Sequence, residues 1–182
     1  VSKATASKST IKALEGVYMY LNGEKLYMKG YDLDLGIETS IRVDGQADGK
    51  IVLNARLLSE IIRKMPEGEI TFYADEELLC HITCNEIEYT IVGTNPADYP
   101  IVPQINDYEN LTLSHPLLKS MITQTVFAAS SDPNKPVLNG AKFDINDGIF
   151  TVIALDGFRL AIRKEKTDAE GVFNFIVPSR TL

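Results

Sequence analysis

The chain has 182 residues, of which 45% are hydrophobic, and its formal net charge is −7. This size and composition predict one large or two small folded domains and argue against disorder. No apolar run is long enough for a membrane span, and residues 1–5 lack a signal-peptide layout, so we expect a soluble cytoplasmic protein. The negative charge argues against an overall DNA-coating surface, so a nucleic-acid role would need a local basic face or enclosure of the DNA.

Short apolar and β-branched runs predict strands through the first half of the chain. They lie at 13–21, 24–30, 36–43, 49–53, 69–75, 77–83 and 86–92. Asn22-Gly23 is a hairpin-turn signal between the first two strands, and the short connections indicate an antiparallel meander. A helix is predicted at 55–64 and ends before Met65-Pro66, because proline disfavours helical backbone at the preceding residue.

The segment 93–107 combines turn residues with three prolines and is predicted to connect two domains, 1–106 and 107–182. After it, 111–113 is predicted to form a short strand and Ser114 to cap a helix. The apolar residues of that helix recur at helical spacing, at Leu117, Leu118, Met121, Ile122 and Val126. Each domain is therefore predicted to be α+β with an antiparallel sheet.

A shift of 124 residues brings the two halves of the chain into register without a gap. Leu14 and Gly16 fall on Leu138 and Gly140, Asp32 falls on Asp156, and 51–56 falls on 175–180, which pairs Arg56 with Arg180. The matches include Gly, Asp and Arg, which strand periodicity alone does not require, so we infer a duplicated fold. In this register the first unit is expected to lack its opening strand and helix, and the second its later helix and strands.

Two sets of residues could bind a metal, and both are better explained structurally. Cys80 and Cys84 fall on one face of a predicted strand and His81 on the other, which favours buried, inert thiols over a zinc site. The possible carboxylate ligands for phosphoryl-transfer chemistry are Asp32, Asp34, Asp144 and Asp156. Since the repeat relates Asp32 to Asp156, a structural role in turns is more natural than two half-sites. Neither His81 nor His115 has a plausible triad, so we expect no enzyme, cofactor or metal.

On the helix at 55–64 the predicted apolar stripe comprises Leu57, Leu58, Ile61, Ile62 and Met65. Arg56 and Arg63 are seven residues apart and share another face. Sequence alone favours an ordinary solvated helix face over a nucleic-acid contact here.

Residues 135–140 (KPVLNG) and 154–161 (ALDGFRLA) resemble the second-domain signature of the bacterial sliding clamps, the beta subunits of DNA polymerase III. The usual forms of that signature are close to R-P-x-L-N-G and A-T-D-G-H-R-L-A. The similarity extends to Ser9-Thr10-Ile11, to Leu14-Glu15-Gly16, to 32–38 and to 97–100, and so covers nearly the whole chain.

This resemblance implies a non-catalytic processivity factor for the replicative polymerase, located at the bacterial nucleoid. Three-domain subunits would form a head-to-tail homodimeric ring, with helices lining the hole and antiparallel sheets outside, which encircles duplex DNA independently of sequence. The third domain would be absent here. The family pattern places Lys8, Arg56 and Arg63 facing the DNA.

The family also binds the polymerase, the clamp loader and other proteins through a short peptide motif. The residues that match the second-domain wall of that pocket are Leu138, Leu155, Gly157, Phe158, Arg159 and Leu160. Leu138, Leu155 and Leu160 could instead be core strand residues. Leu155 and Phe158 replace the usual Thr and His, and Lys12-Ala13 replaces the common Pro-Ile. A stand-alone interaction module that uses only this wall is the alternative to a ring.

Overall fold

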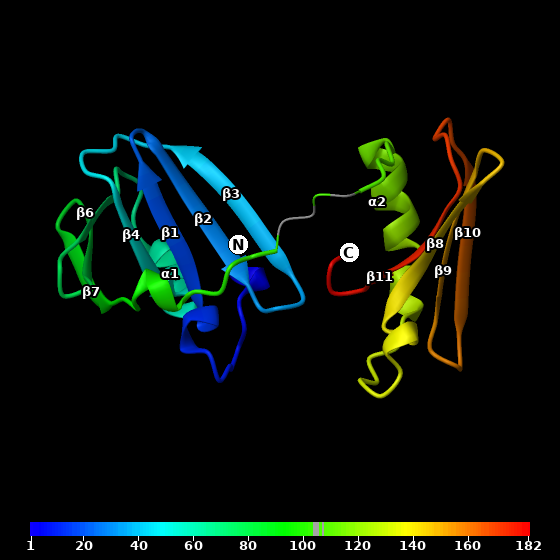
Figure 1. The fold of residues 1–182 in the computed structure, drawn as a ribbon, viewed down its shortest axis with the longest axis horizontal. Coiled ribbons are helices and arrows are strands. Elements are labelled where there is room, and N and C mark those ends of the chain that lie inside the picture. Colours follow the sequence, from blue (N-terminus) through cyan, green and yellow to red (C-terminus); the bar gives the residue numbers. More distant parts are fainter. Residues whose placement is uncertain (104–105, 107) are drawn as a thin grey trace. The chain divides into compact units, whose positions relative to one another are not determined.

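The computed structural model describes residues 1–103, 106 and 108–182, and the chain divides into two compact units, Val1–Gln104 and Ile105–Leu182 (Figure 1). The predicted connection at 93–107 includes residues 104, 105 and 107, which lie outside the described residues. Its first part packs on the first unit, because Thr94 forms a bridge with Val52 and the Tyr99 ring lies 5.3 Å from that of Tyr18. Among the described residues, no helix combines the length and the hydrophobicity that a membrane span requires.

A four-stranded antiparallel sheet forms the centre of the first unit, in the order β3-β2-β1-β4. Its strands are β1 Gly16–Asn22, β2 Lys25–Tyr31, β3 Gly36–Arg42 and β4 Gly49–Asn54. Asn22 pairs with Lys25, so the two turn residues are Gly23 and Glu24, one position later than predicted. Gly23 has φ +55°, which a residue without a Cβ adopts at little cost.

Helix α1, Ala55–Lys64, has the predicted bounds and lies against one face of this sheet (Figure 1). Asn54 caps it by accepting a hydrogen bond from the Leu57 amide at 3.0 Å. The predicted apolar stripe was too wide, because Leu58 and Ile61 are buried whereas Leu57 and Ile62 are 43% and 39% exposed. A helix that packs on one sheet buries its central line of side chains and leaves the flanks in contact with water.

A second, three-stranded sheet completes this unit in the order β5-β6-β7. Its strands are β5 Thr71–Ala74, β6 Leu79–Cys84 and β7 Ile87–Val92. Cys80 and Cys84 are both buried on one face of β6, while His81 is half-buried on the other, as the alternation predicted. Burial raises the pKa of the Cys80 thiol to about 11, which keeps it protonated and unreactive near neutral pH.

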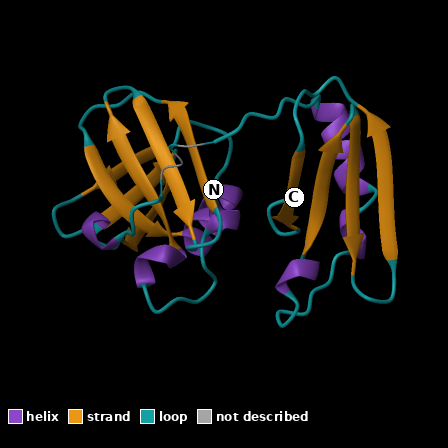
Figure 2. Ribbon diagram, turned by 45° about the vertical axis from the view of Figure 1, so that its right-hand side comes forward, coloured by secondary structure: helices purple, strands orange, loops and turns teal. Residues whose placement is uncertain are grey.

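In the second unit, helix α2, His115–Thr123, packs on a four-stranded sheet of order β10-β9-β8-β11 (Figure 2). The strands are β8 Gly140–Asn146, β9 Ile149–Leu155, β10 Leu160–Lys166 and β11 Phe173–Pro178. The predicted strand at 111–113 was wrong, since this segment pairs with no strand among the described residues. Leu111 and Leu113 still pack on the core, which explains their alternation without a strand ladder.

The two four-stranded sheets confirm the repeat strand by strand. β8, β9, β10 and β11 begin 124 residues after β1, β2, β3 and β4, and the order across the sheet is the same. A Cβ on Gly16 would collide with Val52 Cγ1 and lie 3.0 Å from the Leu53 carbonyl oxygen, and one on Gly140 would collide with the Val177 carbonyl oxygen. Close approach of two strands therefore explains why both units have glycine here.

Candidate nucleic-acid and peptide interfaces

Helix α1 presents an exposed basic surface on its side away from the core. Arg56 lies in the first turn, and its Nε is 3.1 Å from Oε1 of Glu60, one helical turn further on. The Arg56 side chain is 89% exposed, so this pair adds only about 0.3–0.5 kcal/mol and leaves the guanidinium able to change partners. The equivalent Arg180 of the second unit lies in the turn that follows β11 and not in a helix.

Arg63 and Lys64 occupy the last turn of α1 and are exposed. Neither forms an ion pair within the described part of the chain. Both cations also suit the negative end of the helix dipole, which is a structural role for them. Lys64 was not among the predicted DNA-facing residues, because the prediction for this helix rested on the seven-residue spacing of Arg56 and Arg63.

Lys8 is exposed but does not lie on α1. It belongs to the loop between two 3-10 helices, η1 Ser2–Ala4 and η2 Lys12–Glu15. The Ser9 amide, and then the Lys12 ammonium, lower the pKa of Glu15 in this loop. The structure thus places Arg56 and Arg63 on one helix and Lys8 on a separate loop of the same unit.

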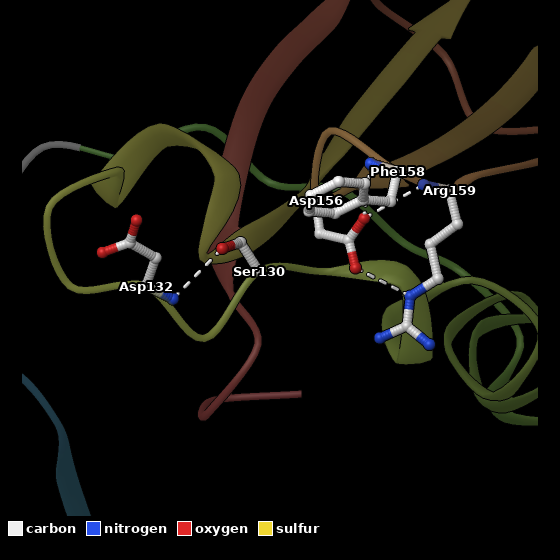
Figure 3. Close-up of polar contacts among 5 residues, drawn as sticks. All are labelled: Ser130, Asp132, Asp156, Phe158 and Arg159. Atoms are coloured by element: carbon white, nitrogen blue, oxygen red, sulfur yellow. Dashed lines mark hydrogen bonds and ion pairs between the residues drawn. The ribbon is translucent and has the colours of Figure 1, made fainter.

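In the second unit, the connection from β9 to β10 is a tight turn organised by Asp156 (Figure 3). Oδ1 of Asp156 accepts hydrogen bonds from the amides of Phe158 at 2.9 Å and Arg159 at 3.0 Å. Oδ2 of Asp156 lies 2.8 Å from Nε of Arg159. The hydrogen bonds from the Phe158 amide and then from the Arg159 amide lower the pKa of Asp156. Gly157 supplies the φ of +95° that the turn requires.

Asp32 has the same role in the first unit, where its Oδ1 accepts from the amides of Asp34 and Leu35 at 3.1 and 2.8 Å. The predicted structural role of Asp32 and Asp156 in turns is therefore confirmed. Leu33, at the position of Gly157, adopts φ +82° without being glycine. No group of three possible metal ligands was found in the described ranges 1–103, 106 and 108–182.

The Asp156 turn presents apolar side chains to solvent. Phe158 is 100% exposed and Leu160 is 60% exposed, so neither is a core residue in this structure. Leu155 is half-buried at the end of β9, directly opposite Leu160 in the strand register. Figure 3 shows the Arg159 side chain beside the Asp156 carboxylate, with a dashed line that joins the two.

Leu138 comes to the same end of the sheet from a different element. It lies in η5, Pro136–Leu138, which leads into β8 beside the end of β9. The Leu138 carbonyl accepts a hydrogen bond from the Ser130 amide at 2.8 Å, and Ser130 Oγ accepts one from the Asp132 amide at 3.1 Å (Figure 3). The loop at 130–138 therefore flanks the predicted wall. It was not predicted from sequence, because the hydrogen bond between Ser130 and Leu138 that brings it close to the wall cannot be read from a local pattern.

Phe158 and Leu160 make the predicted wall an exposed surface within its own unit. A separate hollow lies at the opposite end of the sheet, between the segment before α2 and the β10–β11 connection. Its lining includes Leu113, Leu117, Asp168 and Ala169, and none of the predicted site residues. Leu138, Leu155 and Leu160 could therefore hold a peptide only as one side of a cleft.

Residues 1–103 match the family described as DNA polymerase III beta subunit, N-terminal domain, and residues 112–182 match its central domain. The chain is 37% identical to a beta sliding clamp of Halalkalibacterium halodurans, over 100% of this chain and 51% of the relative. The solved DNA polymerase sliding clamp of Bacillus subtilis is similar with a TM-score of 0.87 and 31% identity, over 100% of this chain and 50% of that one.

A solved DNA polymerase III beta chain of Streptococcus pneumoniae has a TM-score of 0.88 and 25% identity, over 99% of this chain and 50% of that one. The chain thus spans about half the length of the curated relatives it matches. These similarities confirm the predicted α+β fold of duplicated clamp domains.

Proposed function

Because the chain belongs to the DNA polymerase III beta subunit family, we propose that it acts as part of a sliding clamp, a non-catalytic processivity factor of the replicative polymerase. The single observation that carries this proposal is the repeated four-stranded sheet, which in each unit has a helix packed on one face. Such units can be joined into a ring with helices inside and sheets outside. A head-to-tail homodimer of longer subunits would close it.

The charge of the chain supports a topological mechanism over tight DNA binding. A net charge of −7 opposes a strong overall attraction to phosphates, and a closed ring does not need one. Arg56 and Arg63 on α1, together with Lys8 in a loop of the same unit, would supply a few weak contacts with DNA phosphates. These contacts would depend on salt and not on the DNA sequence. Contacts of this kind let the protein slide along duplex DNA.

We further propose that the exposed end of the second sheet binds a short peptide motif of the polymerase, the clamp loader and other partners. Phe158 and Leu160 offer uncovered apolar area, and Leu155 and Leu138 lie at the same end of the sheet. Gly157 lacks a side chain and allows a backbone to approach, while Arg159 is held by Asp156 and can orient a carboxylate or carbonyl. A cytoplasmic, nucleoid-associated location follows from these roles.

Encirclement is tested by loading the complete protein that contains this chain onto nicked circular DNA. We expect it to stay with the circle during gel filtration in salt, and to be released when a restriction enzyme linearises the DNA. A protein held by ordinary contacts would remain equally on both forms, and that result would refute the ring. An interaction module without encirclement would bind partner peptides but would not be retained on circles at all.

A further inference from the structure

We propose that the face of the first sheet opposite α1 binds single-stranded nucleic acid through an aromatic–basic patch formed by Tyr20, Lys25, Tyr27 and Lys50. Tyr20 and Tyr27 are cross-strand partners on β1 and β2, and their rings are stacked with centroids 5.8 Å apart. The Lys50 ammonium lies 5.0 Å from the centre of the Tyr20 ring, and the Lys25 ammonium lies 5.0 Å from that of Tyr27. The patch is thus a row of two rings with a cation at each end.

The patch lies on the opposite face of the sheet from α1. Strand alternation sends Val17 and Met19 into the core beneath α1, so Tyr18 and Tyr20 point to the other side. The site is therefore distinct from the Arg56 and Arg63 surface, and it does not depend on ring closure.

The two lysines of the patch are available to an anion. Neighbouring cations are already paired. Nη2 of Arg42 lies 2.6 Å from Oε2 of Glu24, and Nζ of Lys29 lies 3.0 Å from Oε2 of Glu38. Lys25 and Lys50 are exposed and form no ion pair with a described residue. Their ammonium groups rest on the rings instead, which is the weaker arrangement of the two.

The second unit indicates that the fold does not require this patch. Its sheet has the same strands, order and register at an offset of 124 residues. At the positions of Tyr20, Lys25, Tyr27 and Lys50 it has Asp144, Ile149, Thr151 and Asn174. Since the same scaffold forms without rings or cations there, stability alone does not account for the patch in the first unit.

Single-stranded nucleic acid is the occupant that matches both kinds of group in the patch. Its phosphates suit the lysines and its bases suit the tyrosine faces, whereas an acidic peptide would use only the lysines. A duplex would bury its bases and leave the rings without partners. Tyr20 and Tyr27 are half-buried. A cation over a ring at the protein surface is worth only about two- to fivefold in an equilibrium, and a base stacked on a ring about five- to 150-fold. A base can therefore displace the ammonium, which is then free to pair with a phosphate.

The test uses the whole chain and a fluorescein-labelled oligothymidylate about twelve nucleotides long, with binding followed by anisotropy at low salt. The variant Tyr27→Thr with Lys50→Asn introduces residues that the second unit carries at the same positions, so folding is expected to be kept. The matched control makes the same two changes elsewhere, as Tyr73→Thr with Lys119→Asn, both on exposed sites. We expect the patch variant to bind at least about tenfold more weakly, and the control to bind like the unaltered chain.

Two further probes separate the contribution of the bases from that of charge. An abasic oligomer of the same length carries the same phosphates without rings, and we expect it to bind about as weakly as the patch variant binds oligothymidylate. Equal binding of the abasic oligomer, of a duplex or of polyglutamate would mean that the patch recognises charge alone, and would overturn the proposal. Unchanged binding by a patch variant with an unaltered circular dichroism spectrum would overturn it as well.

Discussion

Replacing Phe158 by alanine is expected to separate peptide affinity from stability in the complete protein. The side chain is 100% exposed, so its removal should change the free energy of unfolding by less than about 0.5 kcal/mol. If a partner peptide covers roughly half of a phenylalanine side chain, about 100 Å² of apolar area leaves water. At about 25 cal/mol per Å² this is worth about 2–3 kcal/mol, or roughly a 30- to 150-fold weaker Kd.

The Kd would be measured by calorimetry with a clamp-binding peptide, and the unfolding free energy by urea denaturation. Tyr73→Ala is the control, because it removes another exposed aromatic ring, 62% exposed, from the first unit. Peptide affinity that is unchanged in Phe158→Ala would remove this residue from the site. A large loss of stability would show that the ring packs within the protein and would refute the reasoning from its exposure.

Three other predictions concern DNA binding, strand packing and the buried thiol. The double variant Arg56→Ala and Arg63→Ala should bind duplex DNA more weakly, and the slope of log K against log salt concentration should become less negative by roughly 2. Both quantities come from anisotropy titrations over a range of salt. An unchanged slope would exclude these residues as phosphate contacts. Gly140→Ala should lower the unfolding free energy by about 1–3 kcal/mol in urea denaturation, because its Cβ would collide with the Val177 carbonyl oxygen. Gly49→Ala, with nothing within 4 Å of the added Cβ, is the control and should have little effect. Because the pKa of Cys80 is raised from 9.0 to about 11, the folded state holds the thiol proton more tightly than the unfolded state does. This contribution to stability is present below pH 9.0 and is lost as the pH rises towards about 11, so Cys80→Ala should lose less stability over that interval; equal losses in both proteins would contradict the raised pKa.

Local signals predicted the elements of this protein well where the signal and the packing agree. Helix α1 has its predicted bounds because Asn54 caps one end and Pro66 follows the other, and both effects act within a few residues. The segment 111–113 has the alternation of a strand but no ladder partner, and a strand needs hydrogen bonds from another chain segment. Leu57 and Ile62 looked like core residues, but how wide a helix face is buried depends on the surface it meets.

The sequence by itself determined the repeat, since each unit encodes the same strands and the same aspartate turns at one offset. Strand alternation also placed Cys80 and Cys84 together and His81 apart. Only the tertiary structure decided which side chains from different strands become neighbours. Tyr20, Tyr27 and Lys50 come from three strands, and their contact depends on a sheet order of β2-β1-β4 that joins strands distant in sequence. Sheet order and register are set by long-range hydrogen bonds and core packing, which no short stretch of sequence specifies.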